Sequence, residues 1–319
     1  MNVLMMSISQ KVPMIKAIKR ALQRAHPGAI LYGADSSADC IGRYWVDMFW
    51  QCPSLNQLSV NDLILYCHKQ NISVIFPSRD GELAYFAEHQ HLLNESGIKV
   101  MISEAEAVQL CLDKLYFYKV LRKQGYPVIP TFTSLEELIL PSPNHSGSFV
   151  VKERLGAGSV GAGIGVQAKD ALRIAENMKS PVFQPFTAGA EYSIDLYLNR
   201  SSFPQGAIAR KRNRIVNGES QITTTTRYPE LEKLCKEIAS KYNLRGHVMF
   251  QVIVDEKNSP HIIECNCRFG GASTLAVAMG LDSFFWFYKE STGASLREFP
   301  FQRGEKEMML IRHAEDLIL

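Results

Sequence analysis

In the first hundred residues, short apolar runs alternate with longer stretches in which apolar residues recur every three or four positions. The runs are typical of buried strands, whereas stretches such as VPMIKAIKRALQRAH (12–26) are typical of amphipathic helices. The strand-like runs are NVLMMSI (2–8), GAILYGAD (28–35), ISVIFPS (72–78) and KVMIS (99–103). Because strands joined by helical crossovers pair in parallel, the pattern predicts an α/β lobe with helices on both faces of a parallel sheet, ending near Ser103.

One strand of this lobe is followed directly by charged residues. Ligands of parallel sheets bind at the carboxyl ends of the strands, and FPSRDGEL (76–83) places Arg79, Asp80 and Glu82 there. Either these residues contact a ligand or they form an ordinary loop with a helix cap, and the sequence leaves both readings open. The first turn, MSISQKVP (6–13), has no glycine fingerprint, so we do not expect this lobe to bind NAD in the usual way.

Composition narrows the class of protein. The chain has 319 residues, of which 46% are hydrophobic, so it can bury a large core divided into two or three lobes. A net charge of +3 with mixed signs gives no field that favours nucleic acid or an anionic membrane. No apolar run approaches the roughly 20 residues of a membrane-spanning helix. The seven cysteines form no CxxC pair and the first residues do not resemble a secretory signal, so we expect a cytoplasmic protein.

The segment KERLGAGSVGAGIGV (152–166) contains the pattern GxGxxG at Gly156, Gly158 and Gly161. A dinucleotide-binding fingerprint must open a helix, but this loop returns to the strand-like IGV, which excludes that reading. A P-loop needs GxxxxGK[ST], with its lysine after the glycines, and a protein-kinase loop has its lysine on a later strand. Lys152 precedes the glycines here, so the order of the residues excludes both kinds of loop.

Two readings of the glycine segment remain. One is a β-hairpin flap whose backbone N–H groups cover a polyphosphate, with Lys152 on the first strand directed at the same charge. The other is a purely structural glycine loop. We favour the flap.

A second hairpin is predicted by GHVMFQVIVDEKNSPHIIECNCRFGGAS (246–273), in which two apolar runs flank the turn-forming DEKNSP. With the turn centred between residues 257 and 258, Gln251 lies opposite Glu264, and Asn266 shares the face of Glu264. Oxygen-bearing side chains on one face of apolar strands suit a hard cation such as Mg²⁺. The alternative is a polar face open to solvent.

The residues around this hairpin favour the metal site. Arg268 and Gly270–Gly271 follow immediately, and a cation, an arginine and glycine-rich backbone together suit phosphate. Cys265 and Cys267 alternate onto the opposite face, where we expect them in the core.

The segment GAIARKRNRIVNGESQITTTTRYPEL (206–231) is rich in basic residues, namely Arg210, Lys211, Arg212, Arg214 and Arg227. Alternation along a strand would place Arg210, Arg212 and Arg214 on one side if the strand continues that far. A run of charge is often a solvated face, and we single out Arg210 as the best candidate for binding.

Four segments, in order, resemble the ATP-grasp enzymes, of the branch near carbamoyl-phosphate synthetase and small carboxylate–amine ligases. They are LDKLYFYKVLRKQGYPVIPTF (112–132), FVVKERLGAGSVGAGIGV (149–166), VFQPFTAGAEYSIDLYL (182–198) and FQVIV…HIIECNCRFGG (250–271). The resemblance implies an α/β protein with the α+β ATP-grasp fold. Its expected domains are a Rossmann-like lobe (1–105), a small lobe with the glycine flap (106–187) and a large lobe with the metal hairpin (188–319).

The resemblance also implies roles for single residues. Those expected to bind the nucleotide are Lys114, Lys152, the flap from Gly156 to Gly163 with Gly158, Ser159 and Gly161, the adenine-pocket residues Gln184, Pro185 and Phe186, and Glu191 at the ribose. Those expected to bind magnesium are Gln251, Glu264 and Asn266, and those expected at the reacting groups are Arg268, Arg210 and Lys152. Two residues depart from the family, because Gln251 and Gln184 stand where many relatives carry an acidic residue.

The implied activity is the ATP-dependent joining of a carboxylate to an amine through an acyl phosphate, with ADP and phosphate as products. The implied cofactors are ATP and Mg²⁺, with Mn²⁺ as a substitute, and the implied partners are a small-molecule carboxylate and amine and a second copy of the chain. Two alternatives remain: a carboxylate or carbamate kinase that stops at the acyl phosphate, and a non-catalytic ATP-binding module. The substrates are open, but we expect the first lobe, the arginines near residue 210 and the tail FPFQRGEKEMMLIRHAEDLIL (299–319) to shape the acceptor pocket.

Overall fold

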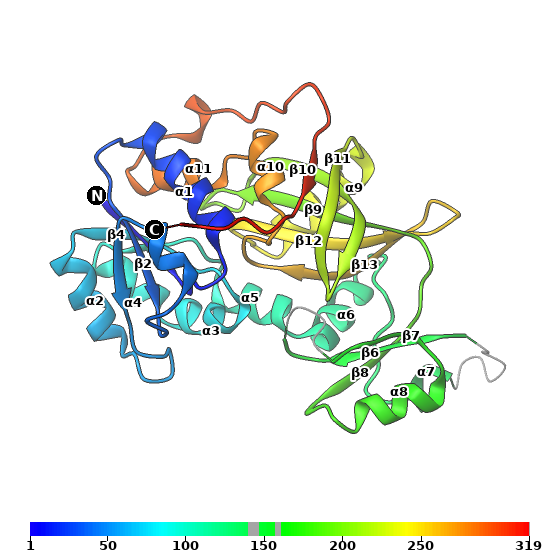
Figure 1. The fold of residues 1–319 in the computed structure, drawn as a ribbon. Coiled ribbons are helices and arrows are strands. Elements are labelled where there is room, and N and C mark those ends of the chain that lie inside the picture. Colours follow the sequence, from blue (N-terminus) through cyan, green and yellow to red (C-terminus); the bar gives the residue numbers. More distant parts are fainter. Residues whose placement is uncertain (140–146, 157–160, 319) are drawn as a thin grey trace.

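The computed structural model describes residues 1–139, 147–156 and 161–318, which form three β-sheets in chain order with helices packed around them (Figure 1). The strands are β1 (Asn2–Met6), β2 (Leu31–Asp35), β3 (Met48–Gln51), β4 (Ile72–Phe76), β5 (Lys99–Val100), β6 (Phe149–Glu153), β7 (Gly163–Val166), β8 (Pro181–Pro185), β9 (Ala190–Leu198), β10 (Pro204–Val216), β11 (Glu219–Thr226), β12 (Gly246–Val254), β13 (Pro260–Asn266) and β14 (Met309–Ile311). The helices are α1 (Val12–Ala25), η1 (Ile41–Tyr44), α2 (Val60–Lys69), α3 (Asp80–Glu88), α4 (Gln90–Glu95), α5 (Ala105–Leu112), α6 (Lys114–Lys123), α7 (Leu135–Ile139), α8 (Ala168–Ala175), α9 (Pro229–Lys241), α10 (Thr274–Ala278), α11 (Ser283–Ser291) and η2 (Leu296–Glu298).

The first sheet is parallel throughout, with the strand order β3-β2-β1-β4-β5. Val3 and Met5 of β1 pack with the apolar stripe of α1, whereas Leu4 and Met6 belong to a second cluster that contains residues of α2 and α3. Helices therefore cover both faces, as predicted. The edge strand β3 was not predicted, because its sequence MFWQ is short and its outer residues are exposed.

The second sheet is small and antiparallel, with the order β7-β6-β8. Val151 of β6 pairs with Gly163 of β7, so the glycine segment does return to a strand, as the sequence predicted. Gly163 is required by close packing, because a Cβ there would lie 2.7 Å from Ile174 Cδ1 of α8. Gly158 and Ser159 lie outside the described residues.

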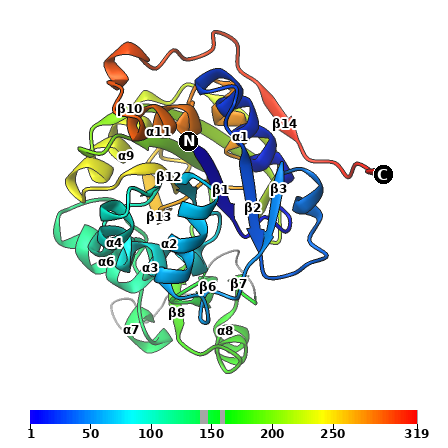
Figure 2. The same ribbon diagram turned by 90° about the vertical axis from the view of Figure 1, so that its left-hand side faces the viewer.

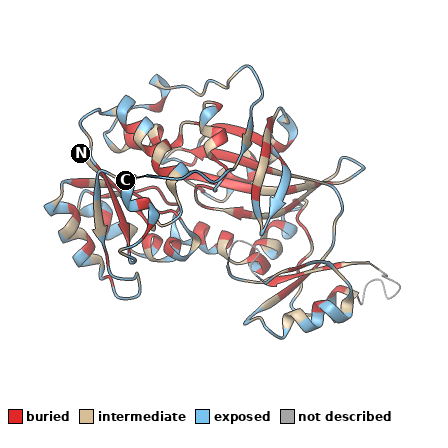
Figure 3. Cartoon of the chain, in the orientation of Figure 1, coloured by how far each residue is buried: buried red, intermediate tan, exposed pale blue. Residues whose placement is uncertain are grey.

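The third sheet has the order β13-β12-β9-β10-β11-β14 and is antiparallel. Its central strands are buried on both sides, as the burial colours of Figure 3 show. Phe250 and Ile194 pack with α9, whereas Tyr197 and Ile208 join the cluster of α1 and α11. Both clusters also contain residues of the first lobe, so the large sheet shares its core with that lobe on both sides.

A link of chain between α6 and α7 joins the two antiparallel sheets. Val128 forms a bridge with Ile262 of β13, and Phe132 forms a bridge with Phe183 of β8. In Figure 1 the small sheet lies beside the end of the large sheet that carries β13, and α6 lies between them. Among the described residues, no helix is long and apolar enough to cross a membrane.

Candidate active site

The hairpin of β12 and β13 forms the expected cluster of oxygen-bearing side chains. Gln251 pairs with Glu264, as predicted, and Met249 pairs with Asn266; a register shift between Gln251 and Val252 separates these pairs from the turn. Gln251, Glu264 and Asn266 all line one cavity. Cys265 lies on the other face of β13 and is 2% exposed, so the thiol is in the core as predicted.

The glycine flap begins next to this hairpin. Lys152 of β6 is 9% exposed, and burial lowers the pKa of its ammonium, although Glu264 acts in the opposite direction. Burial alone would raise the pKa of Glu264, but Lys152 and Lys114 outweigh it and hold the pKa below the usual value. Opposite charges from the small and the large lobe therefore face each other.

Lys114 connects the start of α6 to the flap. Its Nζ donates a hydrogen bond to the carbonyl oxygen of Gly156 at 2.7 Å. The preceding Asp113 caps α6 by accepting the N–H groups of Leu115 and Tyr116, each at 3.0 Å, and also accepts Arg154 Nε at 2.8 Å. Helix α6 is thereby tied to the strand that leads into the flap.

The described ends of the flap have backbone conformations that favour glycine. Gly156 has φ of +128° and Gly161 has φ of +68°. Other residues rarely adopt such angles, which is a physical reason for glycine at these positions.

The residues expected around adenine lie at the end of β8. Gln184 is 2% exposed and its Nε2 donates to Thr131 Oγ1 at 2.8 Å. Pro185 is half-buried, and Phe186 is 45% exposed beside Gly165. Because Gln184 is buried and bonded to Thr131 while Phe186 is exposed, the role of these residues at adenine stays a prediction.

Glu191 of β9 contacts a neighbouring arginine. Arg212 Nη1 donates to Glu191 Oε1, and the same guanidinium donates through Nε to Ser220 Oγ at 2.9 Å and through Nη2 to the carbonyl oxygen of Gly218 at 2.6 Å. The ribose role of Glu191 stays a prediction, and a nucleotide hydroxyl there would share the carboxylate with Arg212.

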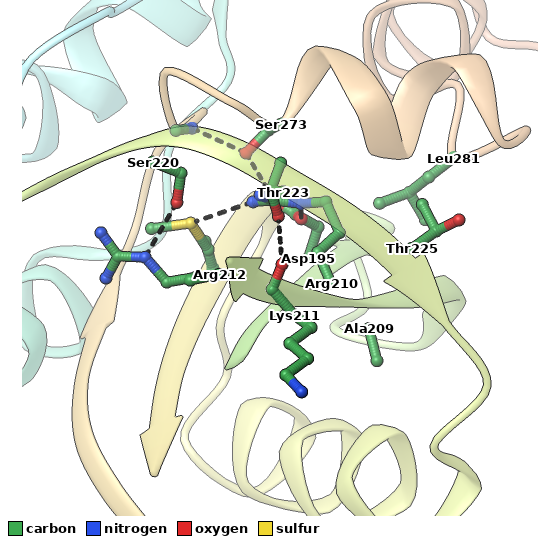
Figure 4. Close-up of polar contacts among 12 residues, drawn as sticks. Asp195, Ala209, Arg210, Lys211, Arg212, Ser220, Thr223, Thr225, Ser273 and Leu281 are labelled. Carbon is green, nitrogen blue, oxygen red and sulfur yellow. Dashed lines mark hydrogen bonds and ion pairs between the residues drawn. The ribbon is translucent and has the colours of Figure 1, made fainter. Parts of the chain in front are cut away.

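Arg210 is almost fully buried at the centre of the large sheet, with 1% of its surface exposed. Its Nε donates to Asp195 Oδ2 at 2.5 Å, and Asp195 also accepts from Ser273 (Figure 4). Asp195 Oδ1 lies 3.2 Å from His247 Nε2. Burial alone would raise the pKa of Asp195, but Arg210 and His247 hold it well below the usual value. Arg210 Nη1 is buried and has no hydrogen-bond partner within residues 1–139, 147–156 and 161–318, so it is free to bind a ligand.

Arg268 joins the large lobe to the first lobe. Its Nε donates to Asp80 Oδ2 at 2.8 Å, and its Nη2 contacts the same oxygen. Glu82, by contrast, is fully buried and accepts the N–H of Ser78 at 2.8 Å, while Arg79 Nε donates to Ser7 Oγ at 2.9 Å. Within the described parts of the chain, Asp80 is the one of the three charged residues after β4 that contacts a candidate site residue.

The expected alignment of three arginines on β10 is only partly correct. The strand does continue to Val216, but its pairing with β11 is irregular between Arg212 and Arg214. Arg210 and Arg212 are buried, whereas Arg214 is exposed. Arg227 lies beyond β11 and pairs at 3.8 Å with Glu307. The bulge breaks the alternation on which the expectation depended.

We call the cavity in front of the metal hairpin the arginine cavity, because Arg210, Arg212, Arg268 and Arg312 line it together with Gln251, Glu264 and Asn266. Its volume is about 90 Å³. Arg312 follows β14, and its guanidinium donates to Glu219 and lies against Gly271. Sequence reasoning named the tail but missed Arg312, because the tail has no periodic pattern that indicates which side chain turns inward.

Two sequence families match the chain. The ATP-grasp domain family matches residues 111–272, and the PylC-like N-terminal domain family matches residues 3–101. No characterised protein matched the chain significantly by sequence alone.

Several solved structures share the fold. One is the biotin carboxylase domain of the Hydrogenobacter thermophilus 2-oxoglutarate carboxylase, in complex with MgADP, ADP and bicarbonate (TM-score 0.77, 16% identity, 97% of this chain and 73% of that chain). Others are biotin carboxylase from Campylobacter jejuni (TM-score 0.75, 16% identity, 97% and 74%) and N5-carboxyaminoimidazole synthetase from Staphylococcus aureus with ADP (TM-score 0.70, 18% identity, 92% and 78%).

At these identities the solved structures show a common fold. The family match spans helix α6, the glycine flap, the interlobe strand and the metal hairpin, which are the segments that carried the resemblance. The chain therefore belongs to the ATP-grasp family.

Proposed function

We propose that this protein is an ATP- and Mg²⁺-dependent carboxylate–amine ligase that activates the acid as an acyl phosphate. The observation that carries the proposal is the opposition of Lys152 and Glu264 across two lobes, with Arg210 and Arg268 lining the same cavity as Glu264. Cations on one side and oxygen ligands on the other suit a metal-bound triphosphate. We also propose the domain boundaries given above, since each expected lobe contains one of the three sheets.

The donor set fits magnesium. Glu264 is held ionised by the lysines, Asn266 and Gln251 add amide oxygens, and the hydrogen bond from Asn266 to Glu264 is long at 3.4 Å, so these side chains can turn toward a cation. Gln251 contributes no charge, so we expect weaker binding than at a site with two carboxylates. Bound Mg²⁺ would supply charge neutralisation for the β- and γ-phosphates.

The protein's own residues would then position the reactants. Lys114 and Lys152 would bind phosphate oxygens, with Lys114 giving up its bond to Gly156. Arg210 Nη1 and Arg268 would bind the carboxylate of the acid. One carboxylate oxygen would then attack the γ-phosphorus, while the bond between the γ-phosphorus and the bridging oxygen to the β-phosphate breaks and ADP leaves. Attack of an amine nitrogen on the acyl carbon would next form the amide and release phosphate, with loss of one proton from nitrogen.

The test measures ADP release by the purified protein with ATP and Mg²⁺. Each candidate carboxylate is combined with each candidate amine, and hydroxylamine serves as a trap for the acyl phosphate. A ligase releases ADP when both substrates are present. A kinase forms hydroxamate with hydroxylamine but no product with other amines, and a binding module releases no ADP. AMP and pyrophosphate as products would contradict the proposal.

Site variants connect the activity to the structure. We expect Lys152→Ala and Glu264→Gln each to lower ADP release at least about a hundredfold, since each removes a charged contact to the transferring group. Lys169→Ala on α8, where the side chain is exposed, is the matched control and should keep the parental rate. Folded variants of Lys152 and Glu264 with unchanged rates would show that the site is elsewhere.

A further inference from the structure

A second, larger cavity adjoins the arginine cavity. It has a volume of about 530 Å³ and lies between the start of α1, the segment after β13 and the tail that follows β14. We call it the tail cavity. The two cavities share four lining residues, Glu219, Gly270, Gly271 and Arg312, so they are direct neighbours.

The tail cavity has an apolar part, which includes Val12, Pro13, Trp45, Phe269, Leu310 and Leu317. Charged and polar side chains line the rest, among them Lys11, Lys16, Glu219, Arg312 and Glu315. The tail closes one side, where Glu315 pairs with Lys16 at 3.7 Å and Lys16 lies 4.1 Å from the ring centre of Trp45. Figure 1 shows the red tail crossing the blue helix α1. A cavity of this size and lining suits the apolar part of a small organic molecule.

A lysine lines the tail cavity. Among the described residues, the Lys11 ammonium has no ion pair and no hydrogen bond. It is partly buried, and burial and Arg268 lower its pKa, although Glu219 and Glu82 act in the opposite direction. A carboxylate beside Lys11 would give this ammonium a partner.

We propose that the carboxylate substrate is an acid with an apolar body, which occupies the tail cavity while its carboxylate lies in the arginine cavity near Arg268 and Arg312. The arrangement selects such acids over bicarbonate or acetate, because small polar acids leave the apolar walls in contact with water. The inference rests on the proposed function only for the step in which the acid is phosphorylated at the metal hairpin.

The direct test is calorimetric binding of straight-chain acids, from acetate to hexanoate, and of 3-phenylpropanoate to the full chain with MgADP. Affinity should increase about threefold for each methylene that enters the cavity. Affinities that are equal along the series, strongest for acetate or bicarbonate, or undetectable for every acid would each overturn the inference.

Two pairs of variants place the acid. Leu310→Trp fills the tail cavity and should weaken hexanoate binding at least about tenfold. Met309→Trp is its control, because Met309 is the exposed neighbour on β14 and does not line the cavity.

Lys11→Met should weaken the binding of every acid about tenfold. Lys19→Met should not, since Lys19 pairs with Asp47 at 2.7 Å outside both cavities. Unchanged affinity in Lys11→Met would overturn the inference even if Leu310→Trp fails to fold.

Binding needs no turnover, so the outcome separates from that of the proposed function. If ADP is released only with small polar acids, the ligase function is supported and the proposal of an acid with an apolar body is contradicted. If apolar acids bind tightly and depend on Lys11 but no ADP is released, the tail cavity is supported as an acid site and the ligase function is contradicted.

Discussion

At the residue scale, the buried charges of the site are held by specific counter-charges. Arg210 depends on Asp195, and Lys152 and Glu264 depend on each other. Breaking a buried pair costs much more than an exposed pair contributes, because one charge is left in a poorly solvated place. The roles of Lys152, Glu264 and Arg268 could be proposed from residue type and spacing. The pairing of Arg210 with Asp195 of β9 and of Arg268 with Asp80 at the start of α3 could not, because these contacts with the arginines depend on the tertiary fold.

The Asp195 carboxylate gives a prediction about pH. Its folded pKa is depressed, so its stabilising contribution is full above the unfolded pKa of about 3.9 and is lost as pH falls toward the folded value. We expect Asp195→Asn to lower the free energy of unfolding by about 3–5 kcal/mol at pH 7. The difference from the parent should stay constant down to about pH 5 and shrink below pH 4, as measured by urea unfolding. Asp170→Asn on the exposed face of α8 is the control and should change the free energy of unfolding by less than about 1 kcal/mol. A difference between Asp195→Asn and the parent that stays constant down to about pH 2 would contradict the account.

Lys152 gives a prediction about nucleotide binding. We expect Lys152→Met to weaken ATP binding by about 10–100-fold, the equivalent of about 1.5–3 kcal/mol for a charged hydrogen bond. Equilibrium binding of a fluorescent ATP analogue with Mg²⁺ would measure it. Lys179→Met, at a position before β8 whose side chain is exposed, is the control. Equal ATP affinities for the parent and Lys152→Met would show that Lys152 does not bind the phosphates.

At the element scale, the hairpin of β12 and β13 was predictable, but not the detail of its register. The predicted pairing of Gln251 with Glu264 is confirmed, although next to the turn Val254 pairs with Pro260, and a register shift between Gln251 and Val252 is what brings Gln251 opposite Glu264. The bulge in β10 was not predictable, because no residue pattern marks it, and it separates Arg214 from Arg210 and Arg212. The edge strand β3 was missed for a related reason, since a half-exposed edge has little alternation.

The neutral ligand in the metal hairpin gives a prediction at this scale. Gln251→Glu places a second carboxylate opposite Glu264, and we expect the Mg²⁺ concentration that half-saturates ADP release to fall about tenfold. Without Mg²⁺ the two carboxylates repel each other, so thermal stability should fall and should recover when Mg²⁺ is added. Gln109→Glu on the exposed face of α5 should change neither quantity. A stability loss that Mg²⁺ does not reverse would argue against a metal at the hairpin.

At the scale of the whole molecule, the candidate site is assembled from all three lobes. The first lobe contributes Lys11 and Asp80, the small lobe contributes Lys152, and the large lobe contributes the metal hairpin and the arginines. The parallel sheet could be predicted from periodicity, and the order of the segments behind it from the order of the motifs. The tail and the first lobe were expected at one pocket, but the pairing of Glu315 with Lys16 could not be predicted, because it depends on how two distant segments pack.

The bond between Asp80 and Arg268 tests this assembly. We expect Asp80→Asn to lower kcat for ADP release by about 10–100-fold while KM for ATP stays near the parental value, because Arg268 loses its orientation but the nucleotide site is untouched. The double variant Asp80→Asn with Arg268→Met should be no slower than Arg268→Met alone. Asp39→Asn, exposed in the same lobe, is the control. Additive losses in the double variant would show that the two residues act independently.

The central claim is that the metal and the triphosphate lie between the glycine flap and the β12–β13 hairpin. The anomalous signal of Mn²⁺ in crystals grown with MnADP measures this position directly. The account predicts a Mn²⁺ peak within about 2.3 Å of oxygens of Glu264 and Asn266, with the phosphates next to Lys152. A peak at the carboxyl edge of the parallel sheet, or at the thiols of Cys265 and Cys267, would contradict it.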